Sequence, residues 1–225
     1  MAYRNRIYTD FERPEKETVE LFRGVQAANI DDTMERIAAV DSAIKRVGKG
    51  QLLGPAFTIR VPQGDNLMLH AAMDLAKPGD VIVIDAGGFE NRAIFGELMS
   101  TYMRSRGIAG VVCDGAIRDK DALAEMENFP VFARAATPNG PYKNGAGKIN
   151  VPVSIGGKTV FPGDIIVGDG DGIVIIPQKE ARSIYEATLK IEEKEAKIME
   201  HILNDGTYER PWVYEKLKEI SCEIK

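Results

Sequence analysis

The sequence predicts an α/β fold in which a helix links two neighbouring parallel strands. Two apolar runs rich in β-branched residues, 81–85 and 110–114, each end in aspartate. Continuous apolar runs of this length are typical of strands that are buried on both faces of a sheet. Residues 94–106 between them follow a helical pattern, and Gly107 is a common residue after the end of a helix. A strand, a helix and a second strand in this order predict a parallel pair with a right-handed crossover.

The residues before this unit predict helices, a strand and a turn. We expect residues 14–46 to be helical, with a break at 27–32 whose aspartates cap the second part. Residues 53–61 predict a strand, and the Pro-Gln-Gly-Asp sequence at 62–65 predicts a turn. Residues 66–76 carry apolar side chains at a helical spacing, so we expect a further helix there.

Glycine and proline mark strand ends and turns in two later parts of the chain. The sequence at 86–88 predicts the end of that strand, because it contains two glycines. Residues 130–180 are rich in glycine, proline and β-branched residues, which predicts short strands in an antiparallel or mixed sheet. Within them, residues 140–147 are expected to form a mobile loop.

A long, highly charged helix is expected at 178–201. A helix this polar is expected to pack against another subunit or to extend from the core. The chain therefore predicts a single domain over residues 1–225. Its core is expected at about 25–180, with a C-terminal helical extension at 178–225.

Charge and composition exclude several classes of protein. The net charge of −5 opposes nucleic-acid binding. The longest apolar runs are far shorter than the roughly 20 residues of a membrane span, and the N-terminus lacks the apolar core of a signal peptide. Cys113 and Cys222 lie far apart and have no metal-binding or redox spacing. We expect a cytoplasmic protein that binds neither nucleic acid nor membrane.

The polar residues with the clearest chemical pattern are an acid, Glu97, and the pair Arg118 and Asp119. The Arg–Asp pair follows a predicted strand, and ligands of open α/β sheets collect at the carboxyl ends of strands. Unpaired N–H groups at the start of the helix near 96–99 would bind a carboxylate such as that of pyruvate. Arginine clamps such an anion, and carboxylates are suitable ligands for Mg²⁺ or Mn²⁺. The same pair also fits an ordinary surface ion pair, so residue chemistry alone leaves both interpretations open.

Other residues support other chemistries less well. His70 fits either a structural histidine or a group near a metal, and the presence of two histidines in all makes a zinc site an unattractive hypothesis. Lys120 is the one lysine near the Arg–Asp pair, and its charged neighbours oppose the neutral amine that a Schiff-base aldolase needs.

Several segments together resemble the RraA-like family, which includes the class II 4-hydroxy-4-methyl-2-oxoglutarate aldolases. The aldolase motif of that family is an acid, twenty residues, then Arg-Asp, and it matches Glu97, Arg118 and Asp119, with glutamate where many members have aspartate. The similarity covers about residues 25–180. The segments that carry it are 32–34, 65–70, 79–88, 95–98, 107–119, 162–164 and 171–174.

The resemblance implies a swivelling β/β/α domain and a role for each motif residue. Gly96, Glu97, Leu98 and Met99 resemble the substrate loop, with Glu97 also a catalytic candidate. Arg118 resembles the arginine that binds substrate and stabilises the enolate, and Asp119 the aspartate that anchors the metal. Members assemble as homotrimers or hexamers, and in the aldolases a C-terminal glutamate of the neighbouring subunit completes the site. The candidates for that glutamate are Glu192, Glu193 and Glu195.

These implications predict a lyase that needs a divalent metal, Mg²⁺ or Mn²⁺. It would cleave 4-hydroxy-2-oxo dicarboxylates to pyruvate, and the same enolate chemistry would decarboxylate oxaloacetate. The alternative is a non-catalytic RraA-type protein that binds and regulates a ribonuclease. A methyltransferase is a weaker hypothesis, because the chain has no glycine-rich S-adenosylmethionine loop.

Overall fold

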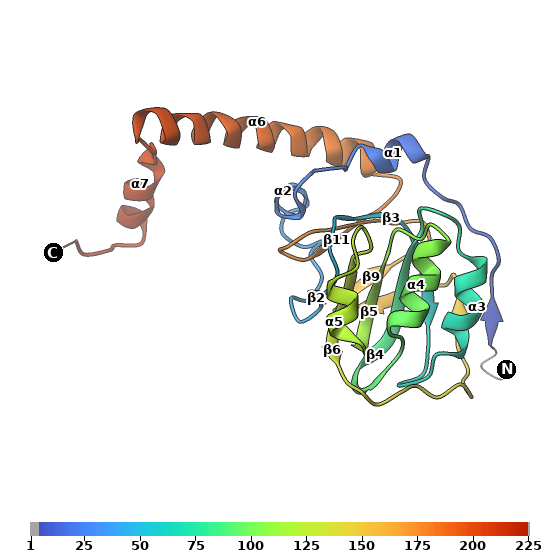
Figure 1. Ribbon diagram of the computed structural model, residues 1–225. Helices are drawn as coiled ribbons and strands as arrows, with labels where there is room; N and C mark the ends of the chain where they lie inside the picture. Colours follow the sequence, from blue (N-terminus) through green and yellow to red (C-terminus); the bar gives the residue numbers. More distant parts are fainter. Residues whose placement is uncertain (1–4, 225) are drawn as a thin grey trace.

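The computed structural model describes residues 5–224, and a mostly parallel sheet lies at its centre. Its four principal strands are β3 (Leu52–Arg60), β4 (Val81–Ala93), β5 (Gly110–Ile117) and β6 (Val131–Ala136), and each is parallel to the next. Three helices connect them: α3 (Leu67–Leu75), α4 (Glu97–Ser105) and α5 (Lys120–Ala124). Figure 1 shows these helices together on one side of the sheet. The predicted strand–helix–strand unit is confirmed.

Shorter strands extend the sheet and cover its other face. The structure therefore has a β layer, a central β layer and an α layer, as expected for a β/β/α domain. The short strands are β1 (Arg6–Ile7), β2 (Lys45–Arg46), β7 (Lys148–Ile149), β8 (Val153–Ile155), β9 (Lys158–Val160), β10 (Ile165–Gly168) and β11 (Ile173–Ile176).

Apolar burial on both faces of the sheet explains why these segments form strands. One hydrophobic cluster joins the sheet to α3, α4 and α5, and a second joins its other face to β8, β9, β10 and β11. Every residue of β5 is buried, as its continuous apolar sequence predicts.

The prediction of helix over 14–46 is wrong for most of that segment. It contains two short helices, α1 (Lys16–Glu20) and α2 (Ala27–Thr33), and then no helix. Glu35 and Arg36 have left-handed backbones with φ of 59° and 62°, which end the helical path. Asp31, predicted as a possible helix cap, instead lies inside α2, and its side chain accepts hydrogen bonds from the N–H groups of residues 38 and 39.

The predicted end of the first apolar strand at 86–88 is also wrong. β4 continues to Ala93, with register shifts against β5 after Asp85 and after Phe89. Gly87 and Gly88 both have positive φ, so the chain bends and then pairs with β5 again. This extension carries the chain along β5 to the start of α4.

The predicted C-terminal helix is confirmed as α6 (Ala181–Asp205), and α7 (Pro211–Glu219) follows it. The buried residues of α6 are Ala181, Ile184 and Thr188, all in its first third. Figure 1 shows the rest of α6 running beyond the body of the protein, with α7 at its far end. Among the helices of residues 5–224, none combines the length and the apolar composition of a membrane span.

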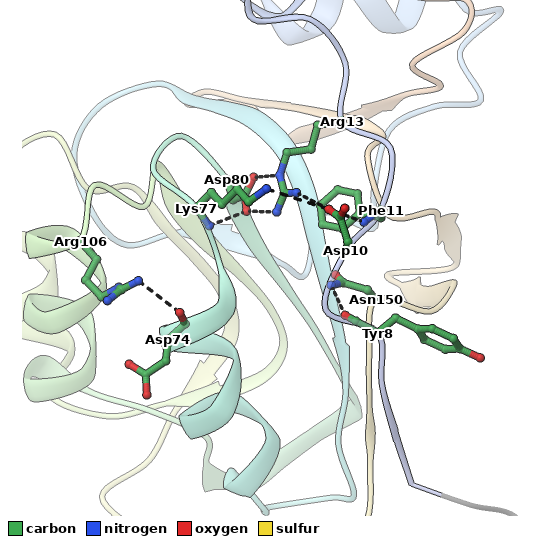
Figure 2. Close-up of polar contacts among 9 residues, drawn as sticks. All are labelled: Tyr8, Asp10, Phe11, Arg13, Asp74, Lys77, Asp80, Arg106 and Asn150. Atoms are coloured by element: carbon green, nitrogen blue, oxygen red, sulfur yellow. Dashed lines mark hydrogen bonds and ion pairs between the residues drawn. The ribbon is translucent and has the colours of Figure 1, made fainter.

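The segment before α1 is fastened to the edge of the body by a buried ion pair. Figure 2 shows Arg13 reaching Asp80, with Nε and Nη2 lying 2.9 and 2.8 Å from the two carboxylate oxygens. Asp80 is only 1% exposed. The backbone N–H of Lys77 also donates to it, and the Arg13 guanidinium stacks over the Phe11 ring at 4.0 Å.

Arg13→Met is therefore expected to destabilise the protein by about 3 kcal/mol, because it leaves a buried carboxylate without its counter-ion. Urea unfolding followed by circular dichroism measures the change. The matched control is Arg182→Met, which removes an exposed pair with Glu15 and should cost less than about 1 kcal/mol. Equal shifts of the two unfolding midpoints would contradict the structural role given to Arg13.

Candidate active site

The extended end of β4 brings two distant motif segments together. The N–H of Ile94 donates to the carbonyl oxygen of Ala116 at 2.8 Å, and the N–H of Arg118 donates to that of Phe95 at 2.9 Å. The residues just before α4 therefore run beside the residues that follow β5. This places Gly96 and Glu97 next to Arg118 and Asp119.

Asp119 binds the first turn of α4 through its side chain. Its Oδ2 accepts the backbone N–H of Glu97 at 3.0 Å and lies 3.6 Å from Nε of Arg118. A carboxylate is stabilised at this position because the N-terminal end of a helix carries a partial positive charge. Asp119 has a left-handed backbone, with φ of 55°, a conformation that is unusual for a residue with a side chain and is often found at functional sites.

Gly96 makes this close approach of the three residues possible. A Cβ atom at this position would collide with Oδ2 of Asp119 and lie 2.7 Å from Cγ of Arg118. The backbone of Gly96 is extended, so the requirement for glycine comes from space and not from conformation.

The start of α4 also offers free backbone donors. The N–H of Ser100 bonds to the carbonyl oxygen of Gly96, whereas those of Leu98 and Met99 have no partner within residues 5–224. Unpaired N–H groups at a helix start bind anions. Together with the guanidinium of Arg118, which is 43% exposed, they form a positively polarised corner.

Arg118 lines two pockets. The first has a volume of about 350 Å³ and the second of about 340 Å³. Residues from four segments line the first: Asn66 and His70, Ile94–Met99 except Glu97, Arg118, and Gly140, Pro141 and Lys143. Asp119 and residues 136–138 line the second with Arg118. Arg118 therefore adjoins two spaces that could hold a small anionic ligand.

The motif residues differ in which of the two pockets they line. Gly96, Leu98, Met99 and Arg118 line the first pocket, and Asp119 lines the second. Glu97 contributes its backbone N–H to the site. The residue is exposed and lines neither of these two pockets. The prediction of a catalytic role for the Glu97 side chain therefore receives no support from its position in one chain.

The three C-terminal glutamates do not reach this site within one chain. Helix α6 packs with α1, α2 and Leu53, which lies near the amino end of β3. Arg118 follows the carboxyl end of β5, and the strands are parallel, so the two lie at opposite ends of the sheet. Glu195 instead accepts a hydrogen bond from Asn29 at 3.0 Å.

No group of three or more His, Cys, Asp or Glu side chains in residues 5–224 is arranged to hold a metal ion. The carboxylate at the site that could bind a metal ion is that of Asp119. Its Oδ2 already accepts the Glu97 N–H and lies near Arg118. Cys113 is fully buried within β5, and burial raises the pKa of its thiol far above the usual range. A thiol that is kept neutral by burial is unreactive.

Several residues of the first pocket are absent from the sequence-based list of site residues. Asn66 lies in a segment that resembles the family, and Lys143 lies in the loop predicted at 140–147. Gly140 and Pro141 gave no signal beyond a turn-rich composition. Their place in the pocket depends on how the 140–147 loop folds against α3, which is a tertiary contact.

Comparisons with known proteins agree with this architecture. A sequence model of the RraA-like family, described as Aldolase/RraA, matches residues 27–175. A Halalkalibacterium halodurans protein named "Putative 4-hydroxy-4-methyl-2-oxoglutarate aldolase" is 44% identical over 170 residues, which are 75% of this chain and 80% of that protein.

Two solved structures are similar over most of their own length. An uncharacterized protein from Pseudomonas syringae is 27% identical with a TM-score of 0.78, over 88% of this chain and 98% of that one. The RNA-processing inhibitor RraA from Thermus thermophilis is 29% identical with a TM-score of 0.63, over 68% of this chain and 93% of that one.

Proposed function

The chain belongs to the Aldolase/RraA family, and on that premise we propose that it is a divalent-metal-dependent lyase acting on 4-hydroxy-2-oxo dicarboxylates. Cleavage of 4-hydroxy-4-methyl-2-oxoglutarate would yield pyruvate and a second carbonyl compound. The same site would decarboxylate oxaloacetate. The observation that carries the proposal is the convergence of Gly96, Arg118 and Asp119 on the start of α4, beside the first pocket.

The 2-keto acid end of the substrate would bind at the start of α4. Its carboxylate would accept hydrogen bonds from the free N–H groups of Leu98 and Met99. The guanidinium of Arg118 would face the oxygen on which negative charge develops. The N–H donors are fixed by the helix backbone, so they need little rearrangement on binding.

The residues present fit a divalent metal ion. The Asp119 carboxylate is about 40% exposed, and both of its interactions within residues 5–224 use Oδ2. Mg²⁺ is commonly held by one or two carboxylates with several water ligands, which this arrangement allows. When bound beside Asp119, the metal would polarise the substrate's C2 carbonyl group.

The proposed reaction is a retro-aldol cleavage. A water or carboxylate removes the proton of the C4 hydroxyl, the C4 oxygen becomes a carbonyl oxygen, and the C3–C4 bond breaks. The electron pair of that bond passes to the C2 oxygen, giving the enolate of pyruvate. Arg118 stabilises this charge until a proton is added at C3. In oxaloacetate the same electron pair is released when carbon dioxide leaves.

The test is pyruvate release by the purified protein, measured with lactate dehydrogenase. With Mg²⁺ or Mn²⁺, both 4-hydroxy-4-methyl-2-oxoglutarate and oxaloacetate should give pyruvate above the rate without enzyme. A chelator should abolish this release, and added metal should restore it. Absence of pyruvate from both substrates in the presence of metal would overturn the proposal.

The C-terminal arm, α6 and α7, supports a homotrimeric or hexameric assembly. It carries large apolar side chains that are exposed in one chain, including Leu203 at 76% and Trp212 at 61%. Packing on a second copy would bury them, and it is the route by which Glu192, Glu193 or Glu195 could reach a neighbouring site. A monomeric mass by light scattering at micromolar concentration would contradict this assembly.

The second candidate is a protein-binding regulator of a ribonuclease. The same exposed arm suits protein contacts, and the similar Thermus protein is named an RNA-processing inhibitor. A pull-down of RNase E with and without Mg²⁺ separates the candidates. Metal-independent capture by a protein that releases no pyruvate would favour the regulator.

A further inference from the structure

The first pocket contains polar groups that the binding of pyruvate leaves unused. Asn66 immediately precedes α3, His70 lies in the first turn of that helix, and Lys143 comes from the 140–147 loop. The remaining wall is largely apolar, with Ile94, Phe95 and Pro141 among its residues. The volume of about 350 Å³ lies at the lower end of the range typical of ligand sites, and suits a small acid.

Asn66 is buried in a fixed orientation with an unused acceptor. Asn66 is only 1% exposed, and its Nδ2 donates to the carbonyl oxygen of Ile94 at 2.9 Å. Because a carbonyl oxygen can only accept, the nitrogen must face it, and Oδ1 must face the other way. Oδ1 is buried and has no hydrogen-bond partner within residues 5–224. A buried acceptor of this kind is destabilising unless a donor binds to it.

His70 presents a second unused polar atom. It lies one helical turn after Asn66, and its backbone N–H donates to the Asn66 carbonyl oxygen at 3.1 Å. Residues four apart lie on the same face of a helix, so both side chains face the pocket that they line. The Nε2 atom of His70 is buried and, in the part of the chain that is described, has no partner.

Lys143 is held at the same pocket by its chain neighbours. The backbone of Tyr142 exchanges hydrogen bonds with Gly64 and Asn66, at 2.8 and 3.0 Å. The N–H of Asn144 donates to Oδ2 of Asp65 at 2.7 Å. Lys143 therefore sits between two anchored residues, while its own exposed side chain stays available for a ligand.

We propose that Asn66, His70 and Lys143 form the subsite that selects the distal half of the substrate. Oδ1 of Asn66 accepts the C4 hydroxyl, and His70 and Lys143 bind a carboxylate attached to C4. The inference rests on the proposed lyase function and deepens it. It predicts a preference for 4-hydroxy-2-oxo acids with a second carboxylate over those with an uncharged group in its place.

The test compares two substrates, 4-hydroxy-2-oxoglutarate and 4-hydroxy-2-oxopentanoate, which differ in having a carboxylate or a methyl group on C4. In the unmodified protein, kcat/KM should be higher for the diacid. Lys143→Met should lower the diacid value by about 10- to 100-fold, mainly through KM, as expected for loss of one hydrogen bond to a charged group. The value for the methyl analogue should fall far less. Lys143→Arg should restore most of the preference.

Two further variants extend the test to α3. His70→Leu removes the ring nitrogen and should reduce the preference, whereas His70→Gln returns a donor near the position of Nε2 and should keep it. Lys158→Met, on β9, makes the same charge change outside this pocket and should leave both substrates unaffected.

Metal-dependent exchange of the methyl protons of pyruvate separates the two hypotheses, because pyruvate has no distal half. Exchange by the unmodified protein, with an unchanged substrate preference in Lys143→Met, would overturn the subsite alone. Absence of both exchange and cleavage would overturn the proposed function, and the subsite with it.

Discussion

Replacement of Arg118 by alanine is expected to lower kcat/KM for pyruvate release by about 10²- to 10³-fold, the range measured when one preorganised donor to a developing oxyanion is removed. Arg118 lines both pockets, and Leu98 and Met99, whose N–H groups have no partner within residues 5–224, line the first pocket with it. The Arg118 side chain is 43% exposed and makes no buried ion pair, so the fold should remain stable. Steady-state pyruvate release and thermal unfolding, measured on the same preparation, check both parts.

Two further variants sharpen this prediction. Arg118→Lys keeps the charge and loses the planar pair of donors, so its activity should lie between those of the alanine variant and the unmodified protein. Arg104→Ala removes an exposed arginine from the last turn of the same helix and should change neither activity nor stability. Full activity of Arg118→Ala would show that the site has been assigned to the wrong residues.

Local sequence signals predict the central part of the fold well. β5 and α4 follow from an uninterrupted apolar run and from a helical pattern that ends before Gly107. The turn around Glu35 does not follow from local signals. Its left-handed backbone is accompanied by hydrogen bonds from the N–H groups of residues 38 and 39 to the Asp31 side chain. The far end of β4 also escapes prediction, because pairing with β5 resumes after glycines that would normally end a strand.

The candidate site, too, is predictable where local sequence signals are sufficient and is not predictable where the packing of distant segments decides. Arg118 and Asp119 follow a buried strand, and the rule that ligands bind at strand ends finds them. The bond from the Glu97 N–H to Asp119, by contrast, depends on how two chain segments pack side by side. The sequence therefore suggested the Glu97 side chain as a participant, whereas the structure uses its backbone. Asn66 was missed as a site residue because its buried, unpartnered oxygen is visible only in three dimensions.

Gly96→Ala is expected to disturb the site as severely as the loss of Arg118, although it removes no functional group. The added methyl group would overlap Oδ2 of Asp119 and lie 2.7 Å from Cγ of Arg118. Relief of that overlap must displace one or both side chains and break the hydrogen bond from the Glu97 N–H to Asp119. We expect a stability loss of about 1–3 kcal/mol from overpacking. Activity should fall by about 100-fold, and Mn²⁺ should bind more weakly by calorimetry.

The control for this substitution is Gly170→Ala, where an added Cβ would meet nothing closer than 3.7 Å. Unchanged Mn²⁺ affinity and activity in Gly96→Ala would contradict the arrangement described for Asp119 and Arg118. If the arrangement is correct, combining Gly96→Ala with Arg118→Ala should add little to the loss from either change alone. Groups that act as a unit are not additive, because the first substitution already removes what the second would take away. The close packing around Gly96 therefore makes a backbone position as important to the proposed chemistry as the charged residues beside it.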